Sequence, residues 1–388
     1  MKLLEYQAKQ LFEKYGLAVQ KGCVVGDLAS LPETVKAAGL AYPVVIKAQV
    51  QIGGRGKAGG ILFADNEADA IESAAKLLHK DIRGLTANEL LIVEKAEIEH
   101  ECYLSILLDR GSKSPMIIFS PRGGMDIEET ARTHPESIAR VTVNPLTGMM
   151  PYHTDYLLDT TGAELDGKTF AQFVGKLYRL FMEYNALLVE INPLAIDPDN
   201  RLLALDGKIE IDDSALFKLP DMLECRSHLQ EDAMVLEARK YNFLYIPLDK
   251  NSDIAVMSNG SGLLMSCIDL LAKKGLTGAA ALDLGGGATA DKIKEAVRIL
   301  LHSGHVQTLL ISIFGGITRC DEVVEGVRLA LAGQAEKKTV VIRMEGTNKD
   351  KGLEIVRSVA DQVTVAQSIP EAAEILYQKH TVQRTVFP

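Results

Sequence analysis

The sequence predicts a two-part protein of the α/β and α+β classes, in which a mixed N-terminal half precedes a parallel sheet covered by helices. At 388 residues the chain exceeds one typical hydrophobic core, so two or three domains are expected. An irregular, charged stretch at residues 213–250 indicates a boundary, and strand and helix patterns alternate beyond it, which is typical of a parallel sheet. The strands of this second half are expected to begin near Ile254, Ala280, Thr308, Thr339 and Val363.

Composition and charge restrict the classes of partner and compartment. The net charge of −10 argues against nucleic acid or an anionic membrane surface as the main partner, although an anion can still bind at a local positive patch. The five cysteines are odd in number and widely spaced, which indicates a reducing compartment without a disulfide framework. No apolar run approaches the ~18 residues of a membrane span, and no signal peptide is recognisable. We therefore expect a cytoplasmic protein without membrane association.

The first elements of the chain lead to a glycine-rich loop. Apolar residues recur at helical spacing over residues 4–15, and strands are expected at residues 43–48 and 61–64. The loop between these strands carries Arg55 and Lys57 among its glycines, and Lys47 lies on the strand before it. Such a flap can fold over a triphosphate, because free backbone N–H groups and cations attract phosphate. A flexible surface hairpin is the alternative interpretation.

The spacing of Gly54, Gly56 and Gly59 resembles a dinucleotide-binding fingerprint only superficially. That fingerprint requires the glycines to open a helix directly after a strand, whereas a second strand is expected here. The loop also lacks the Ser or Thr that follows the lysine of a Walker loop. An NAD-dependent dehydrogenase is therefore disfavoured.

A strand expected at residues 90–94 runs into an acidic stretch that contains Glu97, Glu99 and Glu101. The ordinary interpretation of such a stretch is a solvated edge. A strand that ends in polar residues beside a phosphate-binding flap is equally suited to hold an adenine and its ribose. Further strands are expected at residues 103–109 and 116–119, and helices near residues 126–133 and 168–184.

Residues 186–208 predict a β-hairpin whose turn is centred on Asp199. In that register Asn192 faces Asp206 and Glu190 faces Lys208, and all four side chains project from one face because side chains alternate along a strand. The opposite face is expected to be apolar and packed, and to consist of Val189, Ile191, Leu203 and Leu205.

The polar face of this hairpin suits a hydrated magnesium ion that carries phosphates. Asn192 and Asp206 supply two adjacent oxygen donors, and Mg²⁺ often takes only one or two protein ligands, completing its octahedron with water and phosphate oxygens. A surface hairpin with an ordinary Glu–Lys pair is the alternative.

Glycine-rich or polar turns follow four of the strands expected in the second half. They are residues 259–262 (Asn-Gly-Ser-Gly), 285–287 (Gly-Gly-Gly), 315–318 (Gly-Gly-Ile-Thr) and 345–348 (Glu-Gly-Thr-Asn). Ligands of parallel sheets sit at the carboxyl ends of the strands, where helix N-termini offer N–H groups to anions. Four such turns on one rim indicate an anion site. None of the eight histidines lies in a triad or metal spacing, so no histidine is assigned as a catalyst.

Several motifs resemble the β-subunit family of succinyl-CoA synthetase, from the first residues to about Ala373. They are EYQAKQLF (5–12), KAQVQIGGRGKAGG (47–60), EINPL (190–194), LDGK (205–208), LDLGGGAT (282–289) and FGGITRCD (314–321). The resemblance implies an ATP-grasp domain at residues 1–237 and a flavodoxin-like CoA-ligase domain at residues 238–388. It also implies a partner α subunit, in an αβ or α2β2 complex, that binds most of the CoA and carries a histidine phosphorylated during turnover. The implied reaction joins succinate and CoA with a nucleoside triphosphate, reversibly, in the tricarboxylic acid cycle.

The resemblance also implies roles for individual residues in the N-terminal half. The phosphates of ATP or GTP would contact Lys47, Gly54, Arg55 and Gly56. Glu94 and Glu97 would lie at the adenine, and Glu101 nearer the ribose. Asn192 and Asp206 would bind Mg²⁺, which agrees with the cross-strand pairing. Glu190 would be the catalytic residue that meets the partner's phosphohistidine.

In the C-terminal half the dicarboxylate substrate would contact Asn259, Gly316, Ile317 and Thr318, and the helix that begins near Arg319 would direct its N-terminus at the phosphoryl group. Two alternatives stay open. One is the large subunit of a malate–CoA ligase, although LDGK and FGGI match the succinate type better. The other is a subunit that binds nucleotide without transferring phosphate, against which the intact set of Glu190, Asn192 and Asp206 argues.

Overall fold

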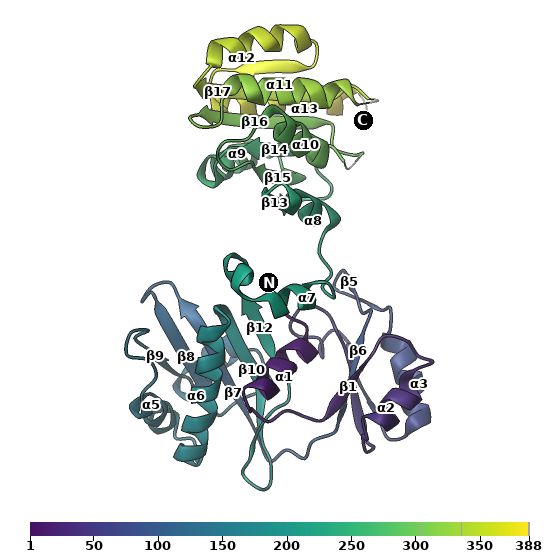
Figure 1. Ribbon diagram of the computed structural model, residues 1–388, viewed down its shortest axis with the longest axis vertical. Coiled ribbons are helices and arrows are strands. Elements are labelled where there is room, and N and C mark those ends of the chain that lie inside the picture. Colours follow the sequence, from purple (N-terminus) through teal and green to yellow (C-terminus); the bar gives the residue numbers. More distant parts are fainter. Residues whose placement is uncertain (303, 335, 387–388) are drawn as a thin grey trace. The chain divides into compact units, whose positions relative to one another are not determined.

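The computed structural model describes residues 1–302, 304–334 and 336–386, which form two compact units that divide between Gln230 and Glu231 (Figure 1). The functional boundary expected between residues 237 and 238 stays a prediction, and its expected end at residue 388 lies outside the described residues. Within the described ranges, no helix combines the length and apolar character needed to cross a membrane.

The first sheet of the N-terminal unit has four antiparallel strands in the order β1-β6-β2-β3. These strands are β1 (Gly22–Val25), β6 (Leu90–Glu94), β2 (Val44–Ala48) and β3 (Ile61–Ala64). The apolar sides of α2 (Leu31–Ala37) and α3 (Glu67–Leu77) pack against this sheet, and β4 (Asp81–Ile82) pairs with β5 (Leu85–Thr86) beside it. Because β2 and β3 pair in antiparallel fashion, with Lys47 opposite Ile61, the glycine-rich loop joins two strands as predicted.

The second sheet of this unit is also antiparallel and runs in the order β11-β10-β7-β8-β9, while β12 pairs with β10 as well. Its strands are β7 (His100–Asp109), β8 (Ser114–Ser120), β9 (Ala139–Thr142), β10 (Ala186–Ile196), β11 (Leu202–Ala204) and β12 (Lys208–Ile211). Helices α1 (Glu5–Lys14), α5 (Pro151–Thr161) and α6 (Gly167–Glu183) bury their apolar sides against it in one core. Shorter helices complete the unit: α4 (Ile127–Thr133), η1 (Pro135–Ser137), η2 (Asp213–Lys218) and α7 (Pro220–Arg226).

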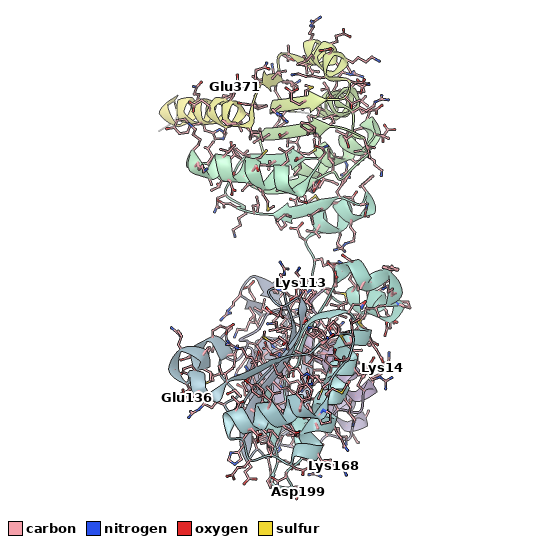
Figure 2. All side chains as sticks on the ribbon, turned by 90° about the vertical axis from the view of Figure 1, so that its left-hand side faces the viewer. Lys14, Lys113, Glu136, Lys168, Asp199 and Glu371 are labelled. Carbon is pink, nitrogen blue, oxygen red and sulfur yellow. The ribbon has the colours of Figure 1, made fainter. Side chains whose placement is uncertain are left out.

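The predicted register of the hairpin is confirmed. Glu190 lies opposite Lys208 in β12, and Leu194 lies opposite Ala204 in β11, as a turn centred on Asp199 requires. Asp199 marks the exposed outer end of this hairpin (Figure 2).

The predicted apolar face of the hairpin is only half right. Val189 and Ile191 belong to the main core, but Leu203 is half-buried and Leu205, although buried, lies outside that core. Beyond residues 192–193 the core side chains are instead Leu194, Ile196, Leu202 and Ala204. The reason is an irregularity in which β10 carries one extra residue against β7 between residues 191 and 194, because a one-residue shift exchanges the two faces of a strand.

The C-terminal unit is a mainly parallel sheet in the order β13-β15-β14-β16-β17-β18. Its strands are β13 (Leu244–Pro247), β14 (Ile254–Ser258), β15 (Ala280–Asp283), β16 (Thr308–Gly315), β17 (Thr339–Gly346) and β18 (Val363–Ala366). The five parallel strands begin at the predicted residues, and their order, 2-1-3-4-5 along the chain, is that of flavodoxin. The antiparallel edge strand β13, which pairs with β15, was not predicted.

Helices cover both faces of this sheet, as its continuous apolar strands require. On one face α9 (Ser261–Lys273) and α13 (Ile369–Val386) pack in one core, and on the other α10 (Ala290–Leu300), α11 (Cys320–Ala332) and α12 (Lys349–Val356) pack in a second. The remaining elements are α8 (Ala233–Lys240) and η3 (Arg357–Val359). This arrangement leaves the glycine-rich turns together at the carboxyl ends of the parallel strands.

Candidate active site

A cavity of about 430 Å³ in the N-terminal unit collects most of the predicted phosphate and metal residues. Several distant parts of the chain form its wall: the start of α1, the glycine-rich loop, the segment before α4 and the β10–β12 hairpin, together with Arg83 and with Tyr103 on β7. Among the predicted residues, those that line it are Gly54, Arg55, Gly56, Glu190, Asn192 and Asp206. The four polar side chains of the hairpin therefore face one space, as the alternation of a strand predicts, because Lys208 lines it too.

Glu190, on β10, belongs to this wall. The hydroxyl of Tyr103 on the neighbouring strand β7 donates a hydrogen bond to Glu190 Oε2 at 3.3 Å. Burial raises the pKa of the Glu190 carboxyl above its ordinary value, although the cation of Lys208 opposes this effect. A carboxylate held in this way can accept a hydrogen bond from an imidazole N–H that enters the cavity.

Asn192 and Asp206 offer oxygen donors that fit a hard divalent cation. Asn192 Oδ1 accepts from the backbone N–H of Gly124 at 2.9 Å, and Asp206 Oδ1 accepts from Gly207 N at 2.7 Å. Among the described residues, no group of three or more His, Cys, Asp and Glu side chains is placed to hold a metal. As a pair of oxygen donors, Asn192 and Asp206 fit Mg²⁺, which takes oxygen ligands and often needs only one or two from the protein.

The two cations predicted to bind phosphate are held by carboxylates. Arg55 Nη2 lies 2.8 Å from Asp206 Oδ1 and 2.8 Å from Glu5 Oε2, and Lys47 Nζ lies 2.9 Å from Glu5 Oε1. The Arg55 side chain is only 6% exposed, so this part of the loop is packed rather than a free surface flap. Lys47 is buried and is not among the residues that line this cavity.

The sequence patterns did not identify Glu5 as a residue of the site. It is the first residue of α1 and is buried, and only the folded structure brings Lys47 and Arg55 to it. The one local signal was Lys9, four residues later on the same helix, whose ammonium lies 3.0 Å from Glu5 Oε1.

The acidic residues predicted to hold the base and ribose do not line this cavity. Glu94 Oε1 accepts a hydrogen bond from Ala41 N at 2.9 Å, and Glu97 is exposed on the segment between β6 and β7. The Glu101 carboxylate lies against Gly124, in the space that a Cβ there would occupy, and the left-handed backbone of Gly124 (φ +74°) independently favours glycine. Their roles at the nucleotide stay predictions.

The four turns at the carboxyl ends of the parallel strands interlock. The side-chain amide of Asn259 donates to Phe314 O at 2.8 Å and accepts from Phe314 N at 3.0 Å, which ties β14 to β16 at the point where the strand order reverses. Buried Thr318 accepts from Gly287 N at 2.9 Å through its hydroxyl. Gly316 and Ile317 are exposed, and α11 begins at Cys320, one residue after the predicted position.

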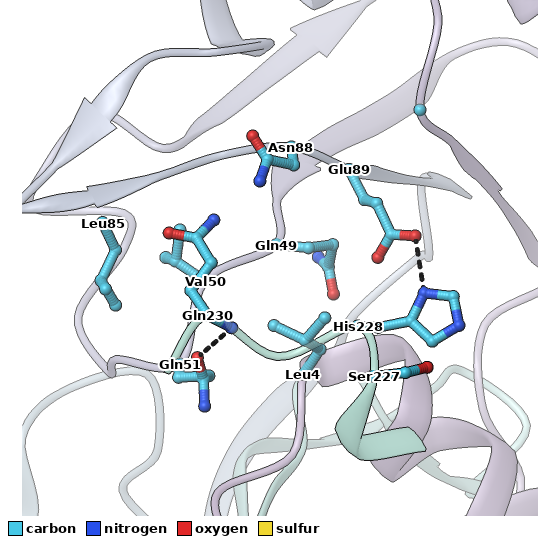
Figure 3. Close-up of a pocket in the computed structure, with 11 residues that line it drawn as sticks. Leu4, Gln49, Val50, Gln51, Leu85, Asn88, Glu89, Ser227, His228 and Gln230 are labelled. Atoms are coloured by element: carbon cyan, nitrogen blue, oxygen red, sulfur yellow. Dashed lines mark hydrogen bonds and ion pairs between the residues drawn. The ribbon is translucent and has the colours of Figure 1, made fainter. Parts of the chain in front are cut away.

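A second cavity, of about 360 Å³, shares Val50 and Gln51 with the first, and Figure 3 shows the side chains around it. Its wall is rich in amides from Gln49, Gln51, Asn88 and Gln230. The backbone N–H of Gln230 donates to Gln51 Oε1 at 3.0 Å, and His228 Nδ1 lies 3.3 Å from Glu89 Oε1. No residue of this wall was predicted to bind a ligand.

Comparison with known proteins is consistent with these two units. Residues 2–196 match the ATP-grasp domain family, and residues 257–375 match the CoA-ligase family. A protein of Pyrobaculum aerophilum named as the β subunit of ADP-forming succinate–CoA ligase is 41% identical over 383 residues, which cover 96% of this chain and 98% of that protein. A protein of the same name from Syntrophobacter fumaroxidans is 40% identical over 387 residues, covering 96% of this chain and 98% of its own.

Among solved structures, the ATP citrate lyase of Methanothrix soehngenii, determined with citrate and coenzyme A, superimposes with a TM-score of 0.73. The match covers 96% of this chain and 99% of that one at 19% sequence identity. This likeness shows a shared fold.

Proposed function

The chain belongs to the family of β subunits of ADP-forming succinate–CoA ligase, an acid–thiol ligase, and we propose that its N-terminal cavity is where phosphate passes between nucleotide and a partner subunit. The observation that carries this proposal is the convergence of the glycine-rich loop with Glu190, Asn192 and Asp206 around one cavity. We assign the ATP-grasp role to residues 1–237 and the ligase role to residues 238–388.

In this proposal Lys47, Arg55 and the backbone N–H groups of Gly54 and Gly56 bind the phosphates. In-line phosphoryl transfer depends mainly on positioning and on neutralising charge, and these groups supply both. Asn192 and Asp206 would hold Mg²⁺, which neutralises phosphate charge when it is bound. Arg55 must exchange a carboxylate for phosphate, because both Glu5 and Asp206 contact it here.

Glu190 is assigned to the partner's histidine. In this proposal its carboxylate accepts a hydrogen bond from one imidazole nitrogen, which leaves the other nitrogen to attack the terminal phosphorus. The chain offers no histidine of its own on the cavity wall among the described residues. This is consistent with a phosphorylated histidine on an α subunit, in an αβ or α2β2 complex.

The C-terminal rim is assigned to the dicarboxylate and to the partner. Asn259, Gly316, Ile317 and Thr318 lie at the carboxyl ends of β14 and β16, where anions bind in such sheets. Ile317 is 86% exposed and Phe314 is 63% exposed, and exposed apolar residues of this size at a functional rim are typical of a protein interface. CoA is expected to bind mainly to the partner. The five free cysteines favour a cytoplasmic location.

The test supplies the complex, isolated with its native partner, with γ-labelled ATP or GTP and Mg²⁺. Acid-labile label is expected on the co-purifying subunit, to be lost on adding succinate and CoA. Discharge by malate instead would favour a malate–CoA ligase, and absence of label despite tight nucleotide binding would leave a binding subunit.

A matched pair of variants tests the cavity itself. Asp206→Asn is expected to reduce labelling by at least about tenfold, because the hairpin loses a proposed Mg²⁺ ligand. Asp199→Asn, at the exposed end of the same hairpin, is expected to label normally. Equal labelling of the two variants would remove Asp206 from the proposed site.

A further inference from the structure

The most heavily charged buried cluster of the N-terminal unit is centred on Glu5. Its side chain is fully buried, and three cations from three parts of the chain contact its carboxylate: Lys9 Nζ at 3.0 Å, Lys47 Nζ at 2.9 Å and Arg55 Nη2 at 2.8 Å. Lys9 and Lys47 approach the same oxygen, Oε1, whereas Arg55 approaches Oε2. One carboxylate therefore orders a cation from α1, one from β2 and one from the glycine-rich loop.

The partners of these cations show how much each depends on Glu5. Lys47 Nζ also donates to the backbone oxygen of Leu205 at 2.7 Å, and Lys9 Nζ also donates to Gln20 Oε1 at 3.1 Å. Arg55 has Asp206 as a second carboxylate. Because two ammonium groups share one oxygen, they lie within about 6 Å of each other and would repel without it.

Charge compensation in this cluster is mutual. Burial alone would raise the pKa of Glu5, but Lys47, Lys9 and Arg55 outweigh it and hold that pKa far below its ordinary range. Burial lowers the pKa of Lys9 to about 8, although Glu5 opposes this effect. The surrounding cations thus favour the ionised form of Glu5, and Glu5 in turn favours the charged forms of Lys9 and Arg55.

We infer that Glu5 is a positioning residue for phosphate binding: its carboxylate fixes Lys47 and Arg55 side by side at the entrance of the glycine-rich loop. This inference rests on the proposed function, because it requires Lys47 and Arg55 to bind phosphate. Glu5 does not act on phosphate directly, since an anion repels it. Its effect is to hold two flexible cations from separate strands in one geometry before the nucleotide arrives, which reduces the cost of ordering them on binding.

The competing explanation is that Glu5 merely anchors α1 to the sheet. The two explanations differ in which ligands should respond. Loss of an anchor weakens every ligand of the cavity alike, whereas loss of cation positioning weakens only ligands that carry phosphates. Lys9→Met offers a matched control, because it removes a buried partner of Glu5 from the same helix while Lys47 and Arg55 keep their carboxylate, and Lys9 does not line the cavity.

The experiment measures dissociation constants of ATP and of adenosine, by calorimetry or by competition, for the complex with its native partner. Glu5→Gln keeps the size and hydrogen-bonding capacity of the side chain but removes its charge. We expect ATP to bind about tenfold or more weakly to this variant, with adenosine changed by no more than about twofold. Lys9→Met is expected to keep the wild-type ratio of the two dissociation constants. Glu5→Asp, which keeps the negative charge, is expected to recover part of the ATP affinity that Glu5→Gln loses.

The outcomes separate this inference from the proposed function. If Glu5→Gln weakens the binding of ATP and of adenosine equally, the inference is wrong and Glu5 is an anchor for α1. If Glu5→Gln binds ATP more tightly, the inference is also wrong, because Glu5 then competes with phosphate. If Lys47→Met selectively weakens ATP while Glu5→Gln does not, the inference fails and the proposed function stands. If neither Lys47→Met nor Arg55→Met affects ATP selectively, the assigned phosphate site is wrong. Should Glu5→Gln not fold, the ATP-to-adenosine ratio of Glu5→Asp decides between these outcomes.

Discussion

Replacing Glu190 by Gln should stabilise the N-terminal unit while it removes phosphoryl transfer. The raised pKa of Glu190 means that folding disfavours its ionised form, mainly through burial. Each unit of such a shift corresponds to ~1.4 kcal/mol at a pH where the group is ionised in both states. Gln has the same size and can still accept the hydrogen bond from Tyr103, so the substitution removes the buried charge and little else.

The sign of this effect fixes its pH dependence. A carboxyl whose pKa is raised in the folded state stabilises the fold below its unfolded pKa, near 4.5, and this contribution is lost as pH rises through the folded pKa. The variant should therefore match the wild type at pH values below about 4.5 and be the more stable of the two at pH 7.5.

Hydrogen exchange of β10 amides, followed by mass spectrometry on the assembled enzyme, measures this difference locally. This choice matters because a chain of two compact units need not unfold in a single step. Glu210→Gln, on the neighbouring strand β12 and outside the cavity, is the control. A stability gain for Glu190→Gln of equal size at pH 4.5 and 7.5, or no gain at all, would refute the argument from buried charge. Retained labelling of the partner subunit would refute the assigned role of Glu190.

Three further perturbations test the packing, the rim and the buried cluster. Gly207→Ala should lower the melting temperature, because its Cβ would lie 2.5 Å from Phe12 Cε2, and overpacking costs ~1–3 kcal/mol. Gly175→Ala, in open space within α6, should raise the melting temperature, because alanine has the better helix propensity. Equal shifts of the two variants would contradict this reasoning. Asn259→Ala removes the two hydrogen bonds that connect the end of β14 to Phe314 on β16. The KM for succinate should rise by about tenfold, while the dissociation constant of the nucleotide stays unchanged. The pKa of Lys9 is lowered to about 8 in the folded protein, so between about pH 8 and 10.5 the unfolded chain binds more protons than the folded one. The stability of the wild type should therefore rise with pH in this range relative to that of Lys9→Met, by at most ~3 kcal/mol. If urea denaturation gives the two proteins the same dependence of stability on pH, this reasoning is wrong.

Local patterns in the sequence determined the elements and much of the hairpin. The five parallel strands start where apolar runs follow turn residues, from Ile254 to Val363, because a buried strand flanked by helices is apolar along its whole length. The turn at Asp199 set the pairing of Glu190 with Lys208, since the position and length of the turn fix which residues of a hairpin lie opposite each other. That alternation also brought Asn192 and Asp206 to one cavity.

Only the tertiary structure decided what surrounds those residues. The extra residue of β10 against β7 exchanges the core face beyond residue 192, and it depends on a strand more than eighty residues away in the sequence. Glu5 meets Lys47 and Arg55 only after α1 docks on both sheets, so no spacing in the sequence could reveal that the predicted phosphate ligands already have a carboxylate partner. Periodicity and turn chemistry act over a few residues, whereas burial and charge pairing are set by which distant segments pack together.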